Sequence, residues 1–185
     1  MTDLDDHYAD LKATVAKFAD TVVAPVAAEL DREHRFPYEI VARMGELGLF
    51  GLPFEEAVGG QGADYFALAL ALEELGRVDQ SVAITLEAAV SLGAMPIHRF
   101  GTPEQKARWL PDLLTGRRLA GFGLTEPEAG SQASQTRTTA RLEGEEWVIN
   151  GTKQFITNSG TDITSLVTIT AVIVVIDYGS KEIYT

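Results

Sequence analysis

The first part of the chain carries hydrophobic residues at the spacing of an α-helix. Between residues 4 and 26 they recur every three or four positions, which places them on one face of a long helix: Leu4, Tyr8, Leu11, Val15, Phe18, Val22 and Val26. Asp3 precedes this pattern as a predicted cap. Pro25 predicts a bend in the helix, because proline lacks an N–H and crowds the preceding turn.

Further helical segments follow up to about residue 118. Phe36-Pro37 marks the start of a second predicted helix. The glycines at 48 and 51 end this helix, and its inward positions are Ile40, Val41, Met44 and Leu47. Residues 64–75, Phe66 included, are apolar on nearly every side of a helix and predict a buried helix. Residues 81–98 show the same apolar pattern. Thr102-Pro-Glu-Gln105 matches a capping box with proline at the first helical position, which predicts a helix start.

The pattern changes after Gly116, where β-branched and aromatic residues appear in short alternating runs. Glu143-Gly144 and Asn150-Gly151 carry turn signals, and Asn150-Gly151 is expected to close a hairpin. Residues 165–176 predict a strand rich in Val and Ile. The fold class is therefore α+β: an all-α N-terminal helical domain, residues 1–118, followed by a partial antiparallel β-domain, residues 119–185.

Composition narrows the classes of function. The chain has 185 residues, and 27 acidic against 15 basic residues give a net charge of −12, which disfavours binding to nucleic acid or an anionic membrane. It contains no cysteine and its start lacks the features of a signal peptide, so we expect a cytoplasmic protein. The apolar stretch 163–176 is too short for membrane insertion. The three histidines show no ligand spacing, so no metal site is predicted.

Two segments of the C-terminal part favour a flavin site. The first, residues 122–131, leaves an apolar strand and places hydroxyls and free backbone N–H groups in a loop. The second, residues 150–158, puts Phe155 two positions before Thr157, so strand alternation points both side chains to one face. A tricyclic isoalloxazine requires a flat apolar wall and a few hydrogen bonds at its polar edge.

At these residues the chain resembles the acyl-CoA dehydrogenases. The resemblance extends from about Asp10 to about Thr170, and its most specific parts are Leu124-Thr-Glu-Pro-Glu-Ala-Gly-Ser131 and Asn150-Gly-Thr-Lys-Gln-Phe-Ile-Thr-Asn158. It implies an FAD-dependent enzyme that oxidises an acyl-CoA thioester to a trans-2-enoyl-CoA. It also implies an electron-transfer flavoprotein as acceptor and a homotetramer as the assembly.

The resemblance also implies roles for individual residues. Thr125 and Thr157 would donate hydrogen bonds near the flavin N5/O4 edge, and Phe155 with Ile156 would lie at the ring. Backbone groups at Phe122, Leu124 and Thr125 would hold the pyrimidine edge. Gly130 would let the chain approach a ligand closely, and Ser131 would also face the acyl-CoA substrate.

The family pattern continues into a C-terminal helical bundle that supplies the catalytic carboxylate, which this chain does not reach, so we expect an incomplete and inactive enzyme. No catalytic base is assigned, although Glu73, Glu74 and Glu126 lie near the relevant elements. Two alternatives remain: a noncatalytic helical binding or assembly module of the same fold, and a related flavin oxidase or monooxygenase. The uncharged, β-prone run 166–176 predicts a strand edge that another copy or a partner chain covers.

Overall fold

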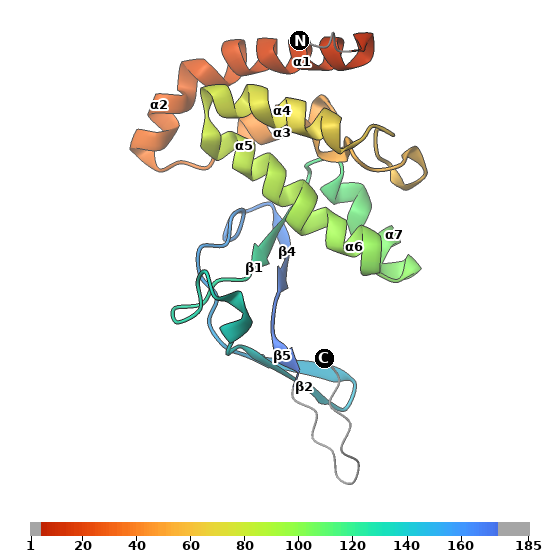
Figure 1. The fold of residues 1–185 in the computed structure, drawn as a ribbon, viewed down its shortest axis with the longest axis vertical. Helices are drawn as coiled ribbons and strands as arrows, with labels where there is room; N and C mark the ends of the chain where they lie inside the picture. The colour runs from red at the N-terminus through yellow and green to blue at the C-terminus, as the bar shows by residue number, and fades with distance from the viewer. Residues whose placement is uncertain (1–4, 174–185) are drawn as a thin grey trace. The chain divides into compact units, whose positions relative to one another are not determined.

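The computed structural model describes residues 5–173, which fall into two compact units (Figure 1). The helical unit comprises residues up to 121 together with 157–167. The second unit comprises, within the described residues, 122–156 and 168–173. Residues 157–167 therefore belong to the helical unit, although they follow residues 122–156 in the sequence. The domain boundary expected after residue 118 stays a prediction.

The helical unit begins with α1 (Asp6–Phe18), the π-helical η1 (Ala19–Val23) and α2 (Ala24–Glu33). Pro25 lies in the first turn of α2. Because proline cannot donate the next α-helical hydrogen bond, the turn before it closes as a π-helix. Figure 1 shows the chain changing direction between α1 and α2. The predicted cap Asp3 lies outside the described residues.

Next come α3 (Tyr38–Glu46) and two 3₁₀ turns, η2 (Leu49–Gly51) and η3 (Glu56–Val58). Ile40, Val41 and Met44 are buried as predicted. The inward position predicted for Leu47 is wrong, since this side chain is 40% exposed. The helix ends at Glu46, and Leu47 already belongs to the turn that leads to Gly48, whose φ is +72°.

Helix α4 (Tyr65–Val78) lies beside α1 (Figure 1). The Asp64 carboxylate caps it by accepting the N–H of Ala67 at 2.9 Å, and it also accepts the Tyr8 hydroxyl at 2.6 Å. Leu68 and Leu75 are buried, but the burial expected for Phe66 is wrong. Its ring is 48% exposed and meets the Tyr8 ring edge-on.

One continuous helical run consists of α5 (Gln80–Glu87), η4 (Ala88–Ala94) and α6 (Met95–Phe100). By length and composition alone it is long and apolar enough to cross a membrane, and half of its most apolar part is buried inside the protein. Helix α7 (Pro103–Leu113) follows, and its predicted capping box is confirmed. Thr102 accepts the Gln105 N–H at 3.3 Å, and the Gln105 side chain accepts the Thr102 N–H at 2.9 Å.

The β-elements form two small sheets. Strand β1 (Leu119–Gly123) pairs with β4 (Thr164–Ile169). Strand β2 (Thr139–Glu143) is central in the other sheet, between β3 (Glu146–Asn150) and β5 (Val172–Ile173). The β2–β3 hairpin is antiparallel, whereas β5 joins β2 in parallel, so the antiparallel pairing expected from the sequence is found in only part of this sheet.

The strand predicted over residues 165–176 is divided in two. Thr170 N–H donates to Gly123 O at 3.1 Å, and Val172 N–H donates to Thr138 O at 2.8 Å. The chain therefore changes its pairing partner within three residues, which interrupts the ladder between β4 and β5. Residues 174–176 of the predicted strand lie outside the described residues.

Two local predictions after β3 are wrong. Asn150-Gly151 does not close a hairpin, because β3 ends at Asn150 and the chain continues without regular structure. A Cβ at Gly151 would collide with Thr138, so glycine is needed there for close approach. Residues 155–157 are not a strand, and φ at Phe155 is +58°. Alternation therefore does not place Phe155 and Thr157 on one face.

Candidate functional site

The first predicted segment folds into a tight turn directly after β1. Glu126 N–H donates to Ala129 O at 3.0 Å, and Ala129 N–H donates back to Glu126 O at 3.1 Å. Leu124 and Thr125 are half-buried on the strand side of this turn. Gly130 and Ser131 are exposed on its far side, and a Cβ at Gly130 would meet no protein atom within 4 Å. Within residues 5–173, no neighbouring atom requires glycine at position 130.

The second predicted segment lies against this turn. The Gln154 N–H donates to Thr125 O at 2.9 Å, and the Gln154 side-chain amide donates to Glu126 O at 3.4 Å. Gly123, at the end of β1, allows the close packing: a Cβ there would lie 3.2–3.3 Å from side-chain atoms of Lys153, Ile156 and Ile169. Residues from the two motifs, 29 positions apart, are therefore in direct contact.

A buried ion pair connects the two segments. Lys153 Nζ lies 2.8 Å from Glu126 Oε1, and the side chains are 6% and 3% exposed. The same ammonium donates to Leu124 O at 3.0 Å and to Thr170 Oγ1 at 2.9 Å, so its three N–H donors all have acceptors. The Glu126 carboxylate also accepts the backbone N–H groups of Arg137 at 2.6 Å and Thr138 at 2.9 Å.

This environment favours the charged carboxylate. Lys153 and the backbone donors of Arg137 and Thr138 lower the pKa of Glu126 from 4.5 to about 2. A carboxylate that holds its charge so firmly is a poor proton acceptor at neutral pH. Glu126 therefore has the properties of a structural anion.

Lys153 is not among the site residues predicted from the sequence. A signal was available, since the charged residues of the first motif are both acidic, Glu126 and Glu128, and the single charged residue of the second is basic, Lys153. Two motifs expected to converge on one ligand would bring these charges together. Charged side chains are almost never fully buried unless they are paired.

The groups that remain available at this turn fit a planar, partly polar ligand. The Phe155 ring is 84% exposed although it is large and apolar. Among the described residues, no protein acceptor is found for the N–H of Leu124 or Thr125. An exposed aromatic face and nearby unpaired donors are the two kinds of contact that an isoalloxazine ring uses.

Thr157 belongs to the helical unit, whereas the other seven predicted site residues belong to the second unit. The buried Asn158 fixes the adjoining backbone in the helical unit: its side-chain amide donates to Thr85 O at 3.0 Å, and its own carbonyl accepts the Thr164 hydroxyl at 2.5 Å. Asn158 takes a positive φ of +64°, which asparagine tolerates better than most residues. Thr157 is half-buried beside this anchor.

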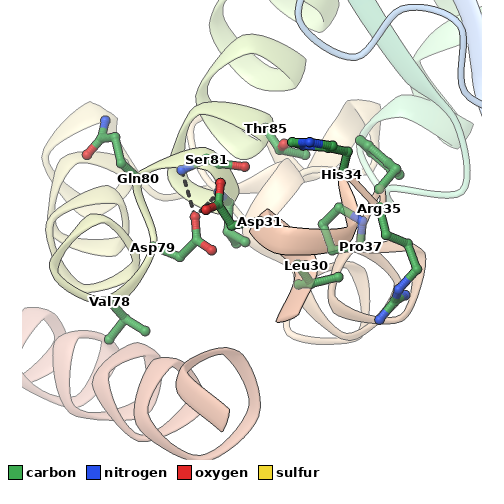
Figure 2. A pocket seen from close by; sticks show the side chains of 12 residues that line it. Leu30, Asp31, His34, Arg35, Pro37, Val78, Asp79, Gln80, Ser81 and Thr85 are labelled. Atoms are coloured by element: carbon green, nitrogen blue, oxygen red, sulfur yellow. Dashed lines mark hydrogen bonds between the residues drawn. The ribbon is translucent and has the colours of Figure 1, made fainter. Parts of the chain in front are cut away.

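The helical unit also contains a cavity of about 550 Å³ near the end of α2 and the start of α5 (Figure 2). Two of its charged groups, Asp79 and Arg35, have structural partners. Asp79 caps α5 by accepting the N–H groups of Ser81 and Val82, and Arg35 donates to Glu39 at 2.7 Å. No predicted site residue lines this cavity. Across residues 5–173, no cluster of three or more potential metal ligands is present.

The profile of the acyl-CoA dehydrogenase N-terminal domain matches residues 5–117, and that of the acyl-CoA dehydrogenase middle domain matches residues 121–180. The chain therefore belongs to the acyl-CoA dehydrogenase family.

Known proteins of similar sequence and structure agree with this assignment. The chain is 47% identical over 158 residues to the probable acyl-CoA dehydrogenase YngJ of Bacillus subtilis, covering 85% of this chain and 42% of the relative. It is similar to butyryl-CoA dehydrogenase from Megasphaera elsdenii, with a TM-score of 0.80, 40% identity, and coverage of 86% and 43% of the two chains.

A further structure is an acyl-CoA dehydrogenase complexed with FAD from Bacillus anthracis, with a TM-score of 0.85, 38% identity, and coverage of 92% and 29%. The chain spans about 40% of the length of the curated relatives it matches.

Proposed function

We propose that the protein containing this chain is an FAD-dependent acyl-CoA dehydrogenase, which oxidises an acyl-CoA thioester between Cα and Cβ to a trans-2-enoyl-CoA. One observation carries the proposal: in a chain of this family, the segment with Thr125 and the segment with Phe155 are joined by direct hydrogen bonds. That junction leaves an aromatic face and backbone donors available for a ligand.

We assign the cofactor contacts to the chain's own residues as follows. Phe155 provides an apolar wall, with Ile156 behind it, and the backbone groups of Phe122, Leu124 and Thr125 bind the pyrimidine edge. The hydroxyl of Thr125 donates to the same ligand. When bound, FAD supplies the hydride acceptor for the oxidation.

On the substrate side, Gly130 provides room for close approach of a ligand. Ser131, exposed at the end of the turn, faces the acyl-CoA and the cofactor. The base that removes the α-proton is not assigned to any residue of this chain. The pairing of Glu126 with Lys153 argues against Glu126 in that role.

Similarity to a butyryl-CoA dehydrogenase makes a short-chain acyl-CoA the substrate to test first. An electron-transfer flavoprotein as acceptor, further copies of the chain as partners, and a cytoplasmic location complete the proposal. These three points rest on the family resemblance and on composition.

Spectroscopy of the purified full-length protein tests the proposal. We expect a flavin absorbance spectrum that bleaches when butyryl-CoA is added without oxygen, and formation of a trans-2-enoyl-CoA in the presence of an artificial electron acceptor. Longer acyl-CoA thioesters, added in turn, measure the chain-length preference. A protein that neither contains nor binds FAD would contradict the proposal.

A further inference from the structure

The Glu126–Lys153 pair forms hydrogen bonds with several separate parts of the second unit. Its hydrogen bonds reach four stretches of chain: the turn at Leu124, residues 137 and 138, the segment at Lys153 itself, and Thr170. The separations along the sequence between bonded residues range from 11 to 29. This buried pair thus connects the turn at Leu124 to residues 137 and 138, to the segment at Lys153, and to Thr170 just before β5.

We propose that Glu126 and Lys153 form a clamp that holds the turn bearing Thr125 against the segment bearing Phe155, and thereby sets the geometry with which these two segments bind the flavin ring. Both are positioning residues rather than catalytic ones. The inference rests on the proposed function, because it assigns the clamp to flavin binding.

The contacts of Lys153 support this assignment. Its ammonium donates to Leu124 O, the carbonyl immediately before Thr125, while the next residue along its own segment, Gln154, donates to Thr125 O. The clamp is therefore within one residue of Thr125 on one side and two residues from Phe155 on the other. A change in the pair would move both segments.

Burial makes the clamp sensitive to the loss of either charged partner. Two charges removed from water are tolerated only when each has hydrogen-bond partners, and both have them here. Removing one partner leaves the other as an uncompensated buried charge, whereas removing both does not. Stability and positioning can therefore be separated by comparing the single change with the double change.

The experiment compares the wild-type full-length protein with Lys153→Met and with the double variant Glu126→Gln/Lys153→Met. The matched control is Arg141→Gln, which also removes one positive charge from an ion pair in the same unit, in this case the exposed pair of Arg141 with Glu143. Three quantities are measured: the thermal midpoint Tm, the Kd for FAD, and the rate of trypsin cleavage after Arg137, whose N–H is held by Glu126.

We expect Lys153→Met to lower Tm, to weaken FAD binding by at least about tenfold, and to accelerate cleavage after Arg137 by a similar factor. The double variant regains most of the lost Tm, since no unpaired charge remains, but its FAD affinity stays low and its cleavage stays fast. Arg141→Gln leaves all three quantities at the wild-type values.

A double variant with the wild-type Kd for FAD and the wild-type cleavage rate would overturn the proposal, because the pair would then act on stability alone. The cleavage experiment needs no cofactor. If wild-type protein binds no FAD, the proposed function fails, and faster cleavage in Lys153→Met still measures the clamp. If wild-type protein binds FAD and Lys153→Met binds it equally well, the clamp inference fails and the proposed function stands.

Discussion

Glu126 remains ionised in a buried position because Lys153 and two backbone N–H groups stabilise its charge. Its neighbour Thr125 is left with an unpaired N–H among the described residues, and the Phe155 ring is largely exposed. At the residue scale, the site contains residues whose charged groups are paired within the protein and residues with groups that are free to contact a ligand. The first group positions the second.

The lowered pKa of Glu126 predicts how stability depends on pH. The folded-state value of about 2 lies below the ordinary 4.5, so the stabilisation by the carboxylate is complete above about pH 4.5 and is lost as the pH falls toward 2. Denaturant unfolding of wild type and Glu126→Gln between pH 2 and 7 measures this. We expect a constant stability difference above about pH 4.5 that shrinks on acidification; a difference independent of pH would contradict the assignment.

Gly130 offers a prediction that separates folding from binding. Because a Cβ at this position meets no protein atom within 4 Å, Gly130→Ala leaves the free energy of unfolding within about 0.5 kcal/mol of wild type. The Kd for FAD or for acyl-CoA should nevertheless rise if a ligand passes close to the backbone here. Equal ligand affinity in Gly130→Ala and wild type would remove this residue from the proposed site.

At the scale of secondary-structure elements, the start of α7 depends on its capping box. Thr102→Ala removes the side-chain acceptor for the Gln105 N–H and is expected to lower the free energy of unfolding by about 1 kcal/mol. Thr102→Ser keeps the hydroxyl and serves as the control. Urea unfolding monitored by circular dichroism gives both values, and equal losses in the two variants would show that the cap is not the cause.

The packing of η4 against β1 depends on Gly93. A Cβ at this position would lie 2.7 Å from the Cβ of Ala120 and 3.1 Å from its carbonyl oxygen, both fully inside the helical unit. Gly93→Ala is therefore expected to destabilise the protein by about 1–3 kcal/mol through overpacking. Gly130→Ala is the matched control in an open position. A Gly93→Ala variant as stable as wild type would show that the two elements move apart at little cost.

Elements were predictable from the sequence where local rules decide them. The helical periodicity, the effect of Pro25 and the capping box at Thr102 each act within a few residues, and each is found in the structure. The division of residues 165–176 and the irregular path at Phe155 were not predictable. They arise from hydrogen bonds between distant residues, such as Val172 with Thr138, which no local pattern specifies.

At the scale of the molecule, the candidate site depends on convergence of segments about 30 residues apart. The resemblance of two motifs to one family indicated that residues near Thr125 and Phe155 would contact one ligand, and the backbone hydrogen bond from Gln154 to Thr125 brings the two segments together. The resemblance did not indicate what holds them together. Lys153 and Glu126 carry no signal as single residues, because an isolated lysine or glutamate in a sequence is normally a solvated surface charge.

The most direct test of the account is an experimental structure of the full-length protein with FAD bound. The account predicts an isoalloxazine ring within about 4 Å of the Phe155 side chain, with its pyrimidine edge accepting a hydrogen bond from Thr125 and the Glu126–Lys153 pair intact beneath it. A flavin bound at another surface, with Thr125 and Phe155 free of contact, would contradict it.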